Sequence, residues 1–244
     1  MKILITGASS GLGAEFSRQY ASKENELILL ARRKEKLQLL AQELEPQCKK
    51  ITLIVVDVTD FTSLQARMRE ILDVDMLILN AGISLGHSSN AVPTIAAFKQ
   101  LYDVNVLANH AILEVLLPKL LAKRSGKVVF ISSLSSLFTM PSATVYASSK
   151  RALNAYAEGL RYQYAQDGLR VLVMLPGFIK SELTDKNDFY MPFLLETSEG
   201  VARMKEAIEA NKIEYAFPLR FYLIIRFLNL LPSALSQRIV NYLS

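Results

Sequence analysis

The feature that most constrains the fold is a regular alternation of short apolar segments with longer helical stretches. Segments of this kind that alternate with helices build a parallel sheet covered by helices on both faces, so the sequence predicts an α/β fold. The third segment, residues 51–56, is almost continuously β-branched, which predicts a strand buried on both faces. The expected strands are residues 2–6, 26–31, 51–56, 75–79, 126–132, 170–175 and 215–218, and the clearest helices are residues 14–21, 61–72, 93–121 and 143–166.

A glycine-rich turn follows the first strand directly. Its spacing is G-x-x-x-G-x-G, and a helix begins at its end. Glycines let the backbone approach a phosphate closely, and the N-terminus of a helix favours negative charge. Because the turn lies between a strand and a helix, it indicates a nucleotide-binding site. The residues expected to contact a cofactor there are Gly7, Ser9, Ser10, Gly11, Leu12 and Gly13.

The end of the second strand bears on the choice of cofactor. In dinucleotide-binding folds an acidic residue at this point selects NAD by binding the adenosine ribose. This chain has Arg32 and Arg33 there instead, and an arginine can pair with a 2′-phosphate, so the sequence favours NADP(H). The alternative is a solvent-facing arginine pair that opens a helix at Lys34, which keeps NAD(H) as the second choice. Asp57 ends the third strand, where its carboxylate would accept a hydrogen bond from the adenine amino group.

A serine, a tyrosine and a lysine form the candidate catalytic set. Ser133 follows an expected strand, and Tyr146 and Lys150 stand four residues apart on an expected helix, so they share one helix face. A free phenol titrates near pH ~10, and a nearby cation lowers that pKa. A serine hydroxyl can stabilise charge that develops on a substrate oxygen. A tyrosine and a lysine at this spacing are also common on helix surfaces, so the pair gains its weight from the rest of the chain.

Composition excludes several classes of protein. One cysteine, Cys48, rules out an internal disulfide and a zinc site of several cysteines, and it suits a reducing compartment such as the cytoplasm. The net charge of +5 comes from scattered pairs of basic residues rather than one stripe, so no nucleic-acid partner is expected. The sequence has no cluster of carboxylates and histidines, so no metal site is expected. His87 lies in a loop near the expected pocket and is a candidate substrate contact, whereas His110 is expected to pack on a helix.

The last third of the chain is expected to build the substrate side of the site. Residues 176–181 follow the sixth strand, at the sheet edge where such folds bind ligands. We interpret residues 183–212 as a substrate lid. Residues 213–244 would form the last strand and an apolar helical tail, in which residues 217–231 have three interpretations: a wall of an apolar substrate pocket, an oligomer interface, or a contact with a membrane surface.

These pieces together resemble the short-chain dehydrogenase/reductase family over roughly residues 1–185. The family motifs occur in the family's order and spacing, which makes the combination highly specific. The resemblance implies one domain, residues 1–244, with a Rossmann-type three-layer fold and a doubly wound parallel sheet of about seven strands, of which residues 1–182 form the core. Beyond the glycine turn, the matching residues are Asp57, Val58, Asn80, Ala81, Gly82, Asn105, Ser133, Tyr146, Lys150, Pro176 and Gly177.

The resemblance also implies roles for these residues. Tyr146 would be the general acid or base, and Lys150 would lower its pKa and hold the nicotinamide ribose. Ser133 would orient the substrate carbonyl, and Asn105 would hold a water in a proton relay to Lys150. Ile179 and Ser181 would hold the nicotinamide carboxamide and the pyrophosphate.

The expected activity is transfer of a hydride between NADP(H) and a carbonyl or secondary alcohol of a small apolar substrate. Phe138, Met140, Phe178 and Leu183 are the candidates to line the substrate pocket. The alternative is a nucleotide-sensing protein without turnover. By resemblance, we expect a homodimer or homotetramer that packs through the helices starting near Pro93 and Ala143.

Overall fold

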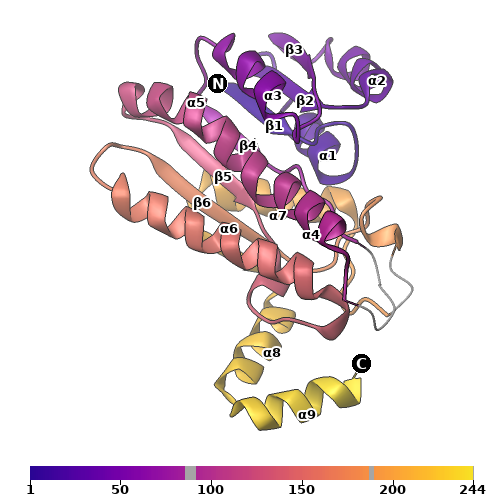
Figure 1. Cartoon of the computed structure of the whole chain (residues 1–244). Helices are drawn as coiled ribbons and strands as arrows, with labels where there is room; N and C mark the ends of the chain where they lie inside the picture. Colours follow the sequence, from indigo (N-terminus) through magenta and orange to yellow (C-terminus); the bar gives the residue numbers. More distant parts are fainter. Residues whose placement is uncertain (86–91, 187–189, 244) are drawn as a thin grey trace.

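The computed structural model describes residues 1–85, 92–186 and 190–243, and its centre is one parallel sheet. The sheet has seven strands in the order β3-β2-β1-β4-β5-β6-β7, and every neighbouring pair is parallel. This is the doubly wound arrangement that the sequence predicts (Figure 1). The strands are β1 Lys2–Thr6, β2 Glu26–Ala31, β3 Lys50–Val55, β4 Met76–Leu79, β5 Lys127–Ile131, β6 Arg170–Pro176 and β7 Glu214–Phe217.

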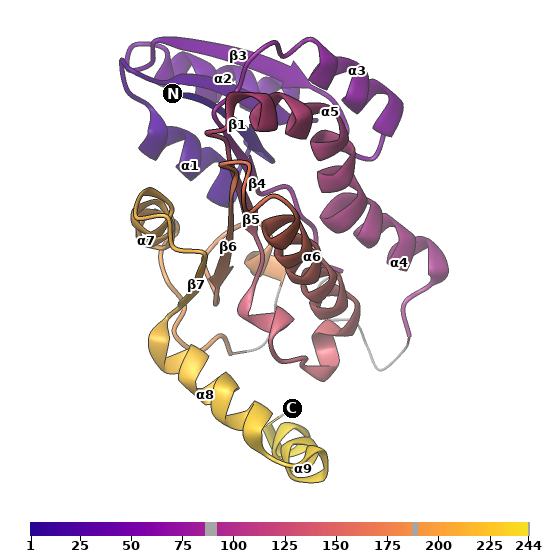
Figure 2. The ribbon, with the colours of Figure 1, turned by 90° about the vertical axis from the view of Figure 1, so that its left-hand side faces the viewer.

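Helices cover both faces of the sheet, and α6 and α7 lie on opposite sides of it (Figure 2). Buried side chains of α1, α2 and α7 form one core with the sheet, and those of α3, α5 and α6 form the other. Burial of these two apolar layers is the main force that holds the strands in place. The helices of the layers are α1 Gly11–Tyr20, α2 Lys34–Leu44, α3 Phe61–Arg69, α4 Ile95–Tyr102, α5 Ala108–Lys123, α6 Thr144–Gln163 and α7 Thr197–Glu209.

The third strand is less buried than its sequence predicts. β3 pairs only with β2 and therefore forms an edge of the sheet. Only Ile54 is fully buried within it, and Val55 is 42% exposed. The prediction of a strand buried on both faces is wrong here, because local composition does not reveal which strand lies at the edge.

The long helix predicted at residues 93–121 is interrupted. α4 and α5 are joined by a π-helical turn, Asp103–Leu107, which contains the buried Asn105. Such a turn widens the helix locally and often marks a functional position. The whole segment 95–123 is long and apolar enough to cross a membrane by length and composition. Half of its most apolar window is buried in the fold, and α5 packs against α3, as a core helix does.

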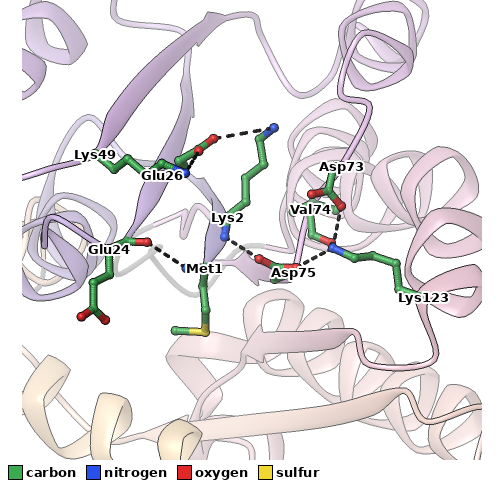
Figure 3. Close-up of polar contacts among 9 residues, drawn as sticks. All are labelled: Met1, Lys2, Glu24, Glu26, Lys49, Asp73, Val74, Asp75 and Lys123. Atoms are coloured by element: carbon green, nitrogen blue, oxygen red, sulfur yellow. Dashed lines mark hydrogen bonds and ion pairs between the residues drawn. The ribbon is translucent and has the colours of Figure 1, made fainter.

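At the amino ends of the strands, charged side chains join β1 to β2 and to the residue before β4 (Figure 3). Lys2 of β1 pairs with Glu26 of β2 at 3.9 Å. Asp75, just before β4, accepts a hydrogen bond of 2.7 Å from the backbone N–H of Lys2 and another from Lys123 Nζ. The same Nζ contacts Asp73 Oδ1 at 2.5 Å. Burial opposes ionisation of Asp75, but the hydrogen bonds from Lys123 and Lys2 outweigh it, so the pKa of Asp75 lies below its usual value.

Asp75→Asn is therefore expected to lower stability at neutral pH and to flatten its dependence on acid. A carboxyl whose pKa is lower in the folded state stabilises the protein above its unfolded pKa, and that stability is lost as the pH falls. We expect a loss of about 1 kcal/mol at neutral pH, or about 2–4 °C in melting temperature. The measurement is melting temperature against pH for both proteins. The two curves should converge at low pH, and parallel curves would contradict the assignment.

Two further helices, α8 Leu219–Leu230 and α9 Ser233–Leu243, extend from the body below β7 (Figure 2). They match the predicted helical tail. The predicted lid, residues 183–212, needs a correction at its far end. α7 packs against α1, and its residues Val201, Met204 and Ile208 are fully buried, so residues 197–209 belong to the core layer.

Candidate active site

A cavity of about 420 Å³ opens at the carboxyl ends of the strands. It lies between the end of β1 and the end of β4, where successive crossovers turn to opposite faces of the sheet. Nearly all the residues predicted from the sequence line it. They are Gly7, Ser9, Ser10, Gly11, Leu12, Arg32, Arg33, Asp57, Val58, Asn80, Ala81, Gly82, Ser133, Tyr146, Lys150, Pro176, Gly177, Ile179 and Ser181.

Two predicted residues, Gly13 and Asn105, lie behind this surface rather than on it. A Cβ on Gly13 would stand 2.2 Å from the carbonyl oxygen of Gly7, so only glycine lets α1 approach the turn so closely. Gly7 and Gly11 have φ values of +68° and +52°, which glycine adopts without strain. The turn therefore presents backbone at the cavity, and α1 begins there at Gly11 with its N-terminus near the expected phosphates.

Thr6 and Asn80 fix the glycine turn to the end of β4. Thr6 Oγ1 accepts hydrogen bonds of 2.9 Å from the backbone N–H groups of Asn80 and Ala81. Asn80 Nδ2 donates to the Thr6 carbonyl at 2.9 Å. Thr6 is fully buried and was not among the predicted site residues, although it precedes the glycine turn directly in the sequence.

The cavity brings together the predicted catalytic residues Ser133, Tyr146 and Lys150. Tyr146 and Lys150 lie one turn apart on α6, and the Lys150 ammonium stands 5.7 Å from the centre of the tyrosine ring. Lys150 is 4% exposed and donates a hydrogen bond of 2.8 Å to the Ile131 carbonyl at the end of β5. The Ser133 hydroxyl hydrogen-bonds the Tyr146 phenol. The hydroxyl, the phenol and the ammonium thus face one cavity.

The pKa of the Tyr146 phenol is raised, whereas the sequence predicts that it is lowered. Burial raises the pKa of Tyr146 to about 12, against the hydrogen bond from Ser133 that favours the phenolate. Burial also lowers the pKa of Lys150 to about 8. The protein groups alone therefore keep Tyr146 as a neutral phenol, because burial outweighs the influence of a lysine whose hydrogen bond goes to a carbonyl. A neutral phenol is a proton donor, and most Lys150 side chains carry a charge at neutral pH.

Ser133 is held by neighbouring serines that the sequence did not single out. Ser135 donates its backbone N–H and its hydroxyl to Ser133 Oγ, at 3.2 and 2.9 Å. The buried Ser136 donates to the Ser133 carbonyl at 2.5 Å and accepts a hydrogen bond from Asn154 Nδ2. These contacts hold both the side chain and the backbone of Ser133 in place after the end of β5.

Asn105 supports the site from the π-helical turn. Its side chain accepts a hydrogen bond of 2.8 Å from Ile83 N–H and donates to the Ile83 carbonyl and to Ser149 Oγ, at 3.0 and 3.1 Å. A Cβ added to Gly82 would lie 3.4 Å both from Asn105 Oδ1 and from Lys150 Nζ, so these two groups border the same glycine. Asn105 thus lies beside Lys150, as a relay between them would require.

The adenosine end of the cavity carries the two predicted arginines. Arg32 pairs with Asp57 at 3.6 Å, and two hydrogen bonds from Thr59 hold that carboxylate. Arg33 donates to Ser9 Oγ at 3.1 Å and to Ser10 Oγ, so its guanidinium lies against the glycine turn. The guanidinium also contacts Glu182, which lines the cavity and belongs to none of the sequence motifs.

The apolar side of the site is only partly as predicted. Leu183 lines the cavity, but Phe138, Met140 and Phe178 are not among its lining residues. Phe178 stacks on Phe221 of α8, with ring centres 5.9 Å apart. Because neither Phe178 nor any described residue of 217–231 lines the cavity, the interpretation of residues 217–231 as a pocket wall stays a prediction.

His110 lies apart from the chemistry described above. His110 hydrogen-bonds the Tyr156 hydroxyl at 2.9 Å on the exposed side of α5, which fits a packing role. His87 lies outside the described residues. Within residues 1–85, 92–186 and 190–243, no three His, Cys, Asp or Glu side chains are grouped as metal ligands would be.

Comparison with known proteins identifies the family. Residues 1–189 match the family model described as short chain dehydrogenase. The chain belongs to the short-chain dehydrogenase/reductase family. It is 32% identical over 236 residues to an uncharacterized oxidoreductase of Myxococcus xanthus, covering 95% of this chain and 93% of that protein. It is 34% identical over 245 residues to an uncharacterized oxidoreductase of Mycobacterium tuberculosis, covering 97% and 96%.

A solved structure agrees with this short-chain dehydrogenase/reductase fold. The short-chain dehydrogenase from Sphingobium yanoikuyae in complex with NADPH matches with a TM-score of 0.83 and 26% identity, covering 89% of this chain and 88% of that one. Short-chain dehydrogenases bind nicotinamide cofactors, and this chain is an oxidoreductase that acts between CH–OH and C=O groups. The predicted family, fold and class of enzyme are confirmed.

Proposed function

We propose that this enzyme uses NADP(H) to interconvert a carbonyl and a secondary alcohol of an apolar substrate, with Tyr146 as the general acid or base. The observation that carries the proposal is the convergence of Ser133, Tyr146 and Lys150 on the cavity that the glycine turn also lines. When bound, the reduced cofactor would supply the hydride. The residues present fit NADP(H). The glycine turn and the helix N-terminus suit the pyrophosphate, and the arginines at the adenosine end of the cavity suit the 2′-phosphate.

In the direction of reduction, Tyr146 donates the phenolic proton to the carbonyl oxygen while a hydride adds to the carbonyl carbon. Ser133 donates a hydrogen bond to the same oxygen and stabilises the charge that develops there. The Lys150 ammonium stabilises the phenolate that Tyr146 becomes, and Asn105 places a proton path beside Lys150. A pKa of about 12 keeps Tyr146 protonated at neutral pH, so the proton is present for reduction, and its transfer depends on stabilisation of the phenolate by Lys150. Oxidation of an alcohol would use the same groups in reverse.

Preference for NADP(H) rests on Arg33, and its replacement tests it. We expect Arg33→Ser to weaken NADPH binding by roughly tenfold or more, because a charge-assisted hydrogen bond to phosphate contributes about 1.5–3 kcal/mol. NADH lacks the 2′-phosphate, so its affinity should change by less than about threefold. The measurement is titration of cofactor fluorescence for both nucleotides. Equal losses for NADPH and NADH would assign Arg33 to a general structural role.

For the substrate, we propose an apolar molecule covered by the segment 190–196. Leu195 forms a parallel β-bridge with Ile179, just after β6. The ring centres of Phe193 and Phe221 lie 6.1 Å apart, so this segment joins the site to α8. The outer face of α8 is exposed at Leu219, Leu223, Phe227 and Leu230. A second copy of the chain, in a homodimer or homotetramer, and a membrane surface are both candidate partners for that face. Size-exclusion chromatography and cosedimentation with anionic liposomes distinguish them.

A further inference from the structure

A carboxylate lies in the basic end of the cavity, where the proposed function places a phosphate. Glu182 contacts Arg33 Nη1 at 2.8 Å through one oxygen and Lys36 Nζ at 2.6 Å through the other. Hydrogen bonding by Lys36 holds the pKa of Glu182 at about 2, so the side chain is an anion at neutral pH. An anion of this chain thus uses the cationic groups that the adenosine phosphate would need.

Glu182 belongs to a segment on the opposite side of the cavity from these groups. It follows Ser181, whose backbone N–H donates to Thr184 Oγ1 at 2.9 Å, and Thr184 Oγ1 donates to the Ile179 carbonyl at 2.9 Å. These bonds make residues 179–184 a compact turn. Arg33 and Lys36 come instead from the start of α2, beside the glycine turn. The two ion pairs therefore join both sides of the cavity at its adenosine end.

The carboxylate and a 2′-phosphate cannot share this place. Both are anions that need the same Arg33 guanidinium, and like charges at hydrogen-bond distance repel strongly when they share donors. The ion pairs of Glu182 are about half exposed, since the side chains of Glu182 and Lys36 are both 49% exposed. Each pair therefore contributes little to stability, and a phosphate can replace the carboxylate with little loss of free energy. A dianionic phosphate is the stronger partner for the arginine.

We propose that Glu182 is an internal competitor for the 2′-phosphate, and that binding of the phosphate releases residues 181–186 from α2. The proposal rests on the proposed preference for NADP(H). It makes Glu182 a specificity-determining residue: the carboxylate lowers affinity for the phosphorylated cofactor and has little effect on the unphosphorylated one. It also couples cofactor binding to the segment that leads into the proposed lid.

Binding of two cofactor fragments tests the competition without turnover. We expect Glu182→Gln to tighten binding of 2′,5′-ADP by roughly five- to tenfold, as loss of two exposed ion pairs allows, and to change binding of 5′-AMP by less than about twofold. Glu196→Gln is the matched control, because Glu196 pairs with Lys180 in the same region but does not line the cavity. This control should bind both fragments as the wild type does. Calorimetry measures all three proteins.

Hydrogen exchange tests the release. In the wild type, 2′,5′-ADP should increase exchange of the backbone amides of residues 181–186, and 5′-AMP should not. The proposal is overturned if Glu182→Gln strengthens the binding of both fragments equally or of neither. It is also overturned if 2′,5′-ADP does not increase amide hydrogen exchange in residues 181–186. In both cases the proposed preference for NADP(H) can still hold. If neither the wild type nor Glu182→Gln binds 2′,5′-ADP more tightly than 5′-AMP, the proposed preference fails together with this inference.

Discussion

Replacing Tyr146 by Phe is expected to reduce turnover by about 10²–10⁴-fold, the range that a general acid contributes, and to leave cofactor binding nearly unchanged. The substitution removes only the hydroxyl that would protonate the substrate oxygen. Its ring keeps the contact with Lys150, whose ammonium lies 5.7 Å from the ring centre. Initial rates of NADPH oxidation with a panel of apolar ketones, together with a cofactor binding titration, measure the two effects separately.

Ser133→Ala gives the matched comparison for this prediction. Ser133 touches the same phenol but donates only a hydrogen bond, so its loss should cost less than the loss of the proton donor. A Tyr146→Phe variant with a wild-type rate would remove Tyr146 from the chemistry. A variant that lost cofactor binding as well as turnover would show instead that the hydroxyl organises the site.

Gly13→Ala is expected to destabilise the protein by about 2–3 kcal/mol and to abolish cofactor binding. The new methyl group would lie 2.2 Å from the Gly7 carbonyl oxygen and 2.7 Å from Asn80 Nδ2. Neither neighbour is free to move, because Gly7 belongs to the backbone of the turn and Asn80 is bonded to Thr6. Displacing them separates α1 from the end of β1, so the helix N-terminus no longer faces the phosphates. Chemical denaturation and cofactor titration measure both losses.

Gly159→Ala is the control for this substitution. Gly159 lies on the exposed side of α6, and a Cβ there would meet no atom within 4 Å. Alanine favours the helix over glycine, so this variant should be more stable than the wild type by about 0.5–1 kcal/mol and bind cofactor normally. If Gly13→Ala behaved like Gly159→Ala, the close approach of α1 to the glycine turn would not be required for binding.

The parts of the site that the sequence predicts are those set by local spacing. The glycine turn follows a strand directly, and Tyr146 and Lys150 share a helix face, so strand and helix geometry alone place them. The strand–helix alternation likewise predicts a parallel sheet. The order of the strands comes only from the structure.

What the sequence does not predict depends on contacts between distant segments. Glu182 and Arg33 are 149 residues apart, and no pattern in the sequence pairs them. The exposure of β3 follows from its place at the sheet edge, and the raised pKa of Tyr146 follows from burial that tertiary packing creates. The interpretation of residues 183–212 as a lid includes α7, because the irregular sequence before α7 hides the start of a helix. The apolar face of that helix packs against α1.

The most direct test follows the hydride itself. NADPH labelled with deuterium at the transferable position of the nicotinamide is incubated with the enzyme and an apolar ketone, and the alcohol product is analysed by mass spectrometry and NMR. A hydride-transfer site at Tyr146 and Lys150 predicts deuterium on the carbinol carbon, with formation of the labelled product strongly reduced in Tyr146→Phe. Tight NADPH binding without label in any alcohol across the panel, or equal labelling by wild type and variant, would contradict it.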